Sequence, residues 1–100
     1  MSKKVTPETA CKKSIKDFCK IYRIEIWPIL QGLGCSPGIA DFLGVWHGKA
    51  IAIEVKSKRG VQSDNQLEFE RRWVQAGGIY ITCRSIEDLA NGLGIKTLLT

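Results

Sequence analysis

The sequence of 100 residues lacks several features that would place it in common classes of protein. It contains no apolar run long enough to cross a membrane, and its N-terminus has no apolar segment of the secretory signal type. It has no phosphate-binding P-loop and no G-x-G-x-x-G sequence that opens a helix. We therefore expect a cytoplasmic protein that belongs to neither common class of nucleotide-binding enzyme.

Histidine and paired cysteine are also scarce. The only histidine, His47, precedes Gly48 in a sequence typical of a turn, so it is a poor candidate for a catalytic base. None of the four cysteines forms a C-x-x-C pair, which argues against a structural zinc site.

Positive charge is in excess. The 15 lysine and arginine residues exceed the 10 acidic residues, which gives a formal net charge of +5. The basic residues are clustered, and six lysines fall within the first twenty positions. A merely basic surface would give the same net charge, but an anionic partner is favoured, and nucleic acid is the commonest.

Hydrophobic periodicity predicts a single mixed α/β domain spanning residues 1–100. Thr6 and Pro7 suit the N-cap and the first position of a first helix. Three β-prone segments follow, and a turn at His47 and Gly48 joins the last two into a hairpin. These segments are residues 23–30, 39–46 and 49–58.

The second half of the sequence predicts a crossover. Ser63 and Gln66 have the spacing of a capping box, and the helix that they open ends at Gly77 and the glycine after it. Residues 79–83 predict a short strand, and Ser85 begins a short helix. The long helix allows the last strand to pair in parallel. The predicted order is α-β-β-β-α-β-α, with a mixed sheet flanked by helices.

Residues 50–56 carry the strongest chemical signal. Strand alternation places Glu54 and Lys56 on one face with Ala50 and Ala52, and the isoleucines and valine on the other face. The small alanines would leave a cleft beside a carboxylate and an ammonium. Burial of these charges is costly unless they pair or bind something, and a simple ion pair stays open as the alternative.

Asp41 begins the neighbouring predicted strand. If the hairpin forms, the carboxylates of Asp41 and Glu54 converge from adjacent strands. Convergent carboxylates repel each other, and a divalent cation such as Mg²⁺ relieves that repulsion. Taken alone, Asp41 could be only a turn or strand-start residue.

Two further polar side chains interrupt the apolar faces of the predicted helices. Glu8 lies on the apolar side of the first helix, and Gln66 on that of the second. Glu8 could simply favour the helix dipole, and Gln66 could be only the capping partner of Ser63. Each could equally point into a site, where Gln66 would orient a phosphate or a water.

Together these motifs resemble the virus-type replication-repair nuclease domain, VRR-NUC, of the PD-(D/E)xK nuclease superfamily. The family has a proline before its aspartate, where this sequence has Ala40, and that proline shapes the backbone without taking part in the chemistry. The resemblance covers roughly residues 8–89 and rests on Gly38-Ile39-Ala40-Asp41, Ile53-Glu54-Val55-Lys56, Ser63 with Gln66, Gly77-Gly78 and Arg84-Ser85.

The resemblance implies a restriction-endonuclease-like core that hydrolyses DNA phosphodiester bonds. It implies that Asp41, Glu54 and the backbone carbonyl of Val55 ligate Mg²⁺ or Mn²⁺, and that Lys56 assists the attacking water. Gln66 matches a helix glutamine of the family, and Glu8 matches the acidic residue of its first helix. Small stand-alone members look similar to Holliday-junction resolvases and act as homodimers, so branched or structured DNA and a second copy are the expected partners.

We expect basic side chains of the first helix and of the loop after residue 56 to bind flanking phosphates, which would make binding salt-sensitive. These residues are Lys12, Lys13, Lys16, Lys58 and Arg59. A non-catalytic DNA-binding subunit with a nuclease fold is the main alternative. A basic RNA-binding module is a weaker one, because no paired aromatics lie on a strand. Near the C-terminus, four apolar residues either form a dimer interface or pack onto their own sheet: Leu93, Ile95, Leu98 and Leu99.

Overall fold

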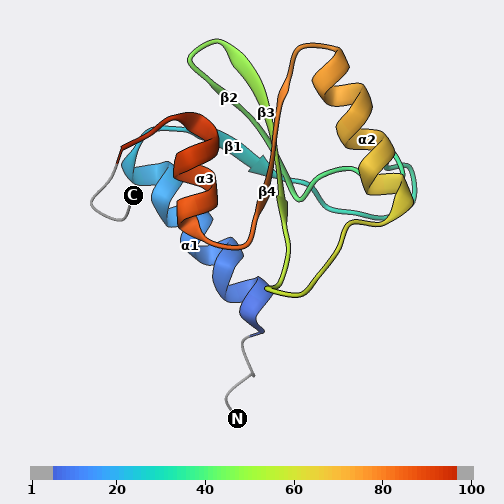
Figure 1. Cartoon of the computed structure of the whole chain (residues 1–100), viewed down its shortest axis with the longest axis horizontal. Coiled ribbons are helices and arrows are strands. Elements are labelled where there is room, and N and C mark those ends of the chain that lie inside the picture. Colours follow the sequence, from blue (N-terminus) through green and yellow to red (C-terminus); the bar gives the residue numbers. More distant parts are fainter. Residues whose placement is uncertain (1–5, 97–100) are drawn as a thin grey trace.

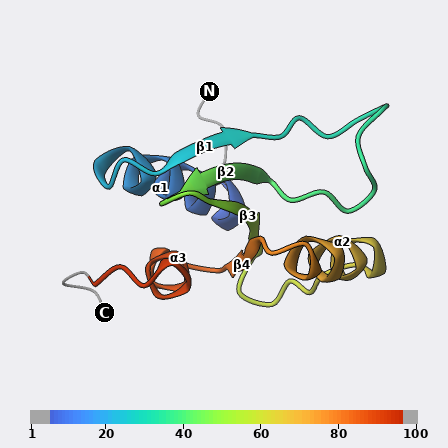
Figure 2. The same cartoon turned by 90° about the horizontal axis from the view of Figure 1, so that it is seen from above.

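The computed structural model describes residues 6–96, which form a four-stranded sheet with helices on both faces (Figures 1 and 2). The elements follow the predicted order α-β-β-β-α-β-α, which confirms the expected mixed α/β fold. The helices are α1 (Pro7–Ile21), α2 (Asp64–Gln75) and α3 (Ile86–Leu93). The strands are β1 (Glu25–Pro28), β2 (Phe42–Trp46), β3 (Lys49–Val55) and β4 (Ile79–Cys83).

The sheet has the strand order β1-β2-β3-β4, and its last pair is parallel, as the crossover helix predicted. The β2–β3 hairpin turns at His47 and Gly48, whose φ angles are both positive, 48° and 80°. Two consecutive positive φ angles match the twist of the flanking strands, so a tight turn fixes the register. That register pairs Phe42 with Ile53 at the end of the hairpin ladder farthest from the turn.

Local capping sets where the two long helices begin. The Thr6 hydroxyl accepts a hydrogen bond from the Thr9 N–H at α1, and both bonds of the Ser63–Gln66 capping box are present at α2. The first strand is shorter than the predicted residues 23–30. Arg23 has a φ of 57°, which is incompatible with a strand, and Pro28 has no N–H for the ladder.

The main core lies between the sheet and the pair of helices α1 and α3. Ile15 of α1 and Leu89 of α3 are fully buried with Ile51 and Ile53 of β3. Leu93 and Ile95 pack against this core, so of the two alternatives they pack onto their own fold. Leu98 and Leu99 lie outside the described residues.

The opposite face of the sheet is covered by α2, and here one prediction is wrong. Ala52 does not line a cleft: it is fully buried with Ala40 beneath Phe69 of α2. The small side chain leaves room for an aromatic ring between helix and sheet. Of the two alanines predicted to line the cleft, Ala50, near the hairpin turn, is the exposed one.

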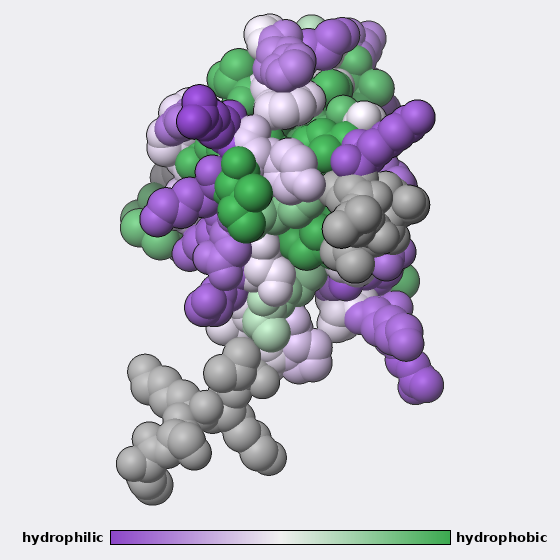
Figure 3. Space-filling model, turned by 90° about the vertical axis from the view of Figure 1, so that its left-hand side faces the viewer, coloured by the Kyte–Doolittle hydropathy of each residue, from purple (hydrophilic) through white to green (hydrophobic). Residues whose placement is uncertain are grey.

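The side of the molecule seen in Figure 3 shows hydrophilic side chains extending from its rim, with hydrophobic atoms visible between them. Within residues 6–96, no helix combines the length and the apolar character needed to cross a membrane.

Candidate active site

Asp41 and Glu54 occupy the next positions beyond the Phe42–Ile53 pair, where β2 begins and β3 ends. The Asp41 Oδ2 atom accepts a hydrogen bond of 2.8 Å from the backbone N–H of Val55. Its backbone oxygen accepts another, also of 2.8 Å, from the N–H of Ile29. Asp41 is therefore held between β3 and the segment that follows β1, with its carboxylate at the end of the sheet.

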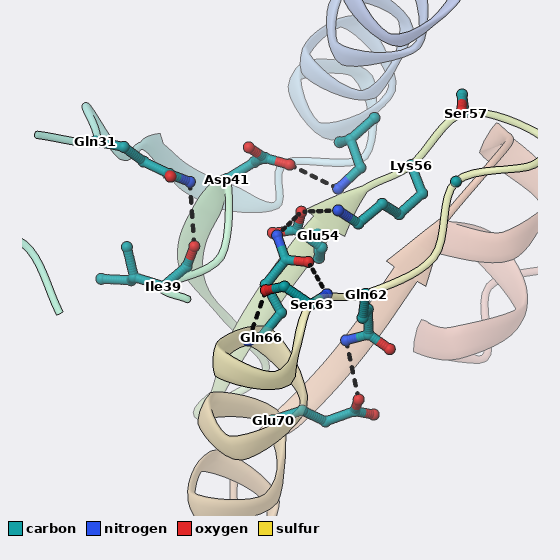
Figure 4. A network of polar contacts seen from close by, with 12 residues as sticks. Gln31, Ile39, Asp41, Glu54, Lys56, Ser57, Gln62, Ser63, Gln66 and Glu70 are labelled. Carbon is teal, nitrogen blue, oxygen red and sulfur yellow. Dashed lines mark hydrogen bonds and ion pairs between the residues drawn. The ribbon is translucent and has the colours of Figure 1, made fainter. Parts of the chain in front are cut away.

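Glu54 is the buried charged residue of the core, with 2% of its surface exposed. Its Oε2 atom accepts a hydrogen bond of 3.0 Å from Gln66 Nε2 and lies 3.5 Å from Lys56 Nζ (Figure 4). Its Oε1 atom is buried and has no hydrogen-bond partner among residues 6–96. Gln66 and Lys56 thus hold one oxygen of this carboxylate, whereas neither contacts the other oxygen.

Each carboxylate also faces an ammonium group. Lys56 Nζ lies beside Glu54, and Lys12 Nζ of α1 lies 3.4 Å from Asp41 Oδ1. The Lys12 side chain is 38% exposed and the Lys56 side chain 17%. The site therefore draws on α1, β2, β3 and α2, with positive charge approaching from two sides.

Burial is the main reason that the pKa of Glu54 is raised from 4.5 to about 7. The negative charge of Asp41 raises this pKa further, and the neighbouring Lys56 lowers it. The charge of Asp41 adds to the effect of burial, so the pair disfavours a second negative charge. Such a pair favours a bound cation.

No model of a protein family and no curated protein matches this sequence. A solved structure described as a VRR_NUC domain matches at a TM-score of 0.72, over 86% of this chain and 92% of that one, with 22% sequence identity. The protein has the VRR_NUC fold. At this level of identity the likeness establishes the fold of a nuclease domain, and the chemistry has to be argued from the site itself.

Within the VRR_NUC fold, four of the predicted site residues meet: Asp41, Glu54, Lys56 and Gln66. Gln66 is the capping partner of Ser63, because its Oε1 accepts from the Ser63 N–H, and its Nε2 donates to Glu54. The backbone N–H of Val55 contacts Asp41, which places this residue at the site as well.

Other predicted residues lie farther from this centre. Glu8 is half-buried one turn before Lys12, and no hydrogen bond or ion pair among residues 6–96 joins it to Asp41 or Glu54. Lys13 pairs with Asp17 of its own helix. Lys16 lies exposed on α1, and Lys58 and Arg59 lie exposed in the loop after β3.

Sequence reasoning gave no structural role to two groups near the candidate site. Arg84 Nη1 donates hydrogen bonds to the backbone oxygens of Ser57 and Gly60, each with a donor–acceptor distance of 2.6 Å. These two bonds fix the loop after Lys56. Because β3 and β4 pair in parallel, Arg84, which follows β4, lies beside the loop that follows β3. The predicted parallel pairing could therefore have placed Arg84 near this loop. On the α2 side, Gln62 donates to both Glu70 and Tyr80.

Proposed function

We propose that this protein is a divalent-metal-dependent DNA endonuclease. The proposal rests above all on the buried Oε1 of Glu54, which has no hydrogen-bond partner in the part of the chain that the structure describes and belongs to a carboxylate beside Asp41. A buried carboxylate oxygen without a partner costs on the order of 1–3 kcal/mol. A bound cation would remove this cost and the repulsion between the two carboxyl groups.

The donor set suits Mg²⁺ or Mn²⁺. Asp41, Glu54 and the backbone carbonyl of Val55 would hold the metal through oxygen atoms. Among residues 6–96 there is no group of three or more His, Cys, Asp or Glu residues suited to a metal. The remaining positions would therefore be water, and Mg²⁺ usually keeps several waters. When bound, such a metal polarises a phosphoryl oxygen and lowers the pKa of a coordinated water.

The protein side chains have separate tasks in this mechanism. Lys56 would stabilise the negative charge that develops on the phosphate, because its ammonium stands beside Glu54 and remains partly open to substrate. Gln66 would orient Glu54 by holding Oε2, which leaves Oε1 for the metal. Asp41 would be kept in place by the Val55 N–H.

A non-catalytic DNA-binding subunit is the competing function. Such a subunit needs a basic surface, but it gains nothing from two carboxyl groups that repel each other in a buried position. The cost of that arrangement favours a catalytic role, in line with the tendency of shifted pKa values to cluster at functional sites.

The preferred substrate that we propose is branched DNA, such as a four-way junction, cut by a homodimer. Symmetric cutting of two strands requires two active sites, which a dimer with two-fold symmetry supplies. The described surface offers apolar area for such contact, because Trp27 on β1 and Val45 on the neighbouring β2 are 51% and 44% exposed. Analytical ultracentrifugation over a range of concentrations tests the dimer, which a single monomeric species would contradict.

The decisive experiment compares cleavage of a four-way junction and of a linear duplex in Mg²⁺. Glu54→Gln and Lys56→Met should each lower the rate by roughly 10²-fold or more, whereas Lys49→Met, an exposed lysine at the hairpin, should cut like wild type. Undiminished cutting by either site variant would disprove the mechanism.

Calorimetry with Mn²⁺ separates the two candidate functions independently of cleavage. The enzyme should bind the metal, and Asp41→Asn should weaken that binding strongly. No binding by the wild type, or equal binding by the variant, would support the DNA-binding subunit.

A further inference from the structure

A groove of about 440 Å³ lies between α1 and β1, next to the candidate active site. Lys16 and Lys20 line it on the helix side, and Ile24, Ile26 and Pro28 line it on the strand side. Phe42, which directly follows Asp41 in the sequence, also contributes to the lining. One end of the groove therefore lies close to Asp41.

The lysines of α1 lead from the active site into this groove. Lys12 contacts Asp41, and Lys16 and Lys20 follow at intervals of four residues on the same side of the helix. Four residues advance an α-helix by about 6 Å, which is close to the distance between neighbouring phosphates of an extended nucleic-acid strand. Within residues 6–96, no ion pair engages Lys16 or Lys20.

We propose that this groove holds one unpaired DNA strand that leaves the active site at Asp41, with Lys12, Lys16 and Lys20 contacting successive phosphates. The proposal rests on the nuclease function and extends its branched substrates beyond the fully paired four-way junction to DNA with a single-stranded segment beside the cleavage point. Positively charged grooves that follow the backbone are the usual means of binding single strands.

The size and lining of the groove favour a single strand over a duplex. A volume of about 440 Å³ admits a group of nucleotide size, whereas a double helix is far too wide to enter. The apolar wall of Ile24, Ile26 and Pro28 suits the face of a base. Glu25 also lines the groove, and its negative charge should repel an anionic strand. Removal of this charge should therefore strengthen binding of the strand.

The test measures binding without metal, by fluorescence anisotropy, so that it does not depend on cleavage. The probes are a labelled 12-nucleotide strand and a duplex of the same sequence. Wild type is compared with the double variant Lys16→Gln, Lys20→Gln and with Lys49→Gln, which removes the same kind of charge from the hairpin outside the groove. Melting temperatures confirm that all variants fold.

The double variant should bind the single strand at least several-fold more weakly. The slope of log K against log salt should fall by about 1.4, because each phosphate contact contributes about 0.7 for single strands. Glu25→Gln should bind the strand more tightly than wild type. Lys49→Gln should resemble wild type in both affinity and slope.

Two results would overturn the proposal. One is a double variant that binds the strand no more weakly than Lys49→Gln does. The other is an equal loss of affinity for the duplex, which would mean that these lysines serve a double-stranded surface. Failure of the nuclease function is a separate outcome, because it would show as absent Mg²⁺-dependent cleavage by a wild type that still binds the strand through the groove.

Discussion

Gln66 Nε2 donates a hydrogen bond of 3.0 Å to Glu54 Oε2, while Gln66 Oε1 accepts a hydrogen bond of 2.9 Å from the Ser63 backbone N–H. The same amide thus closes the cap of α2 and orients the buried carboxylate. The rigid first turn of the helix fixes where Glu54 can point, which links helix capping to the geometry of the site.

This double role predicts different effects for two substitutions in the same cap. Ser63→Ala should lower the free energy of unfolding by about 1 kcal/mol, because it removes one bond of the capping box. Gln66→Ala should lower it by at least as much, because it removes the other capping bond and also the donor to the buried Glu54. Only Gln66→Ala should also lower the cleavage rate, by about tenfold or more, since only it removes the donor to Glu54. Urea denaturation and single-turnover cleavage give the two quantities. Equal cleavage by both variants would show that Gln66 serves the cap alone.

The raised pKa of Glu54 predicts how the stability of the metal-free protein depends on pH. The folded protein holds this proton up to about pH 7, whereas a carboxyl with its ordinary pKa of 4.5 loses it earlier. Because the folded state binds the proton more tightly, the free energy of unfolding should fall as pH rises from about 4.5 to about 7, and level off above that. Glu54→Gln cannot ionise and should lack this decline.

At about pH 8, Glu54→Gln should therefore be more stable than metal-free wild type, by on the order of 2 kcal/mol. Urea denaturation of both proteins across the pH range measures the difference. Asp64→Asn, which removes an exposed carboxylate at the start of α2, serves as the control and should leave the pH dependence nearly parallel to wild type. Parallel curves for Glu54→Gln and wild type would contradict the prediction.

Gly38 allows the loop before Asp41 to lie directly on the start of α2. Its φ is 75°, and a β-carbon there would overlap the backbone carbonyl of Asn65. Gly34, in the same loop, has a φ of 94° but no atom near the position of a β-carbon. Gly34→Ala should cost about 1 kcal/mol of stability through backbone strain alone. Gly38→Ala should cost about 3 kcal/mol or more through strain and overlap together. Chemical denaturation measures both, and equal losses would rule out the close approach to α2.

The hydrogen bonds of Arg84 should limit how readily a protease reaches the loop that carries Lys58 and Arg59. Its guanidinium donates to the carbonyl oxygens of Ser57 and Gly60, so Arg84→Gln should loosen the loop. Trypsin cleaves after lysine and arginine, and it should therefore cut this loop several-fold faster in the variant. Peptide mapping locates the cut, and Arg71→Gln, which removes an arginine that pairs only within α2, is the control. Unchanged proteolysis at Lys58 and Arg59 would show that the two hydrogen bonds do not restrain the loop.

The local features of this protein followed from its sequence. The N-cap at Thr6, the hairpin turn at His47 and the capping box at Ser63 each depend on residues within a few positions of one another. Strand alternation placed Glu54 on the face opposite the isoleucines, because side chains in a strand alternate whatever packs against them. The hairpin then brought Asp41 beside Glu54.

The packing of the helices was decided only by the tertiary structure. The pairing of Lys12 with Asp41, the burial of Ala52 under Phe69 and the double use of Gln66 all depend on where α1 and α2 lie on the sheet. That placement depends on how side chains from distant segments fill the space between helix and sheet, which periodicity does not encode. The sequence by itself therefore determined which residues share a face, and the packing of the helices determined which of them meet.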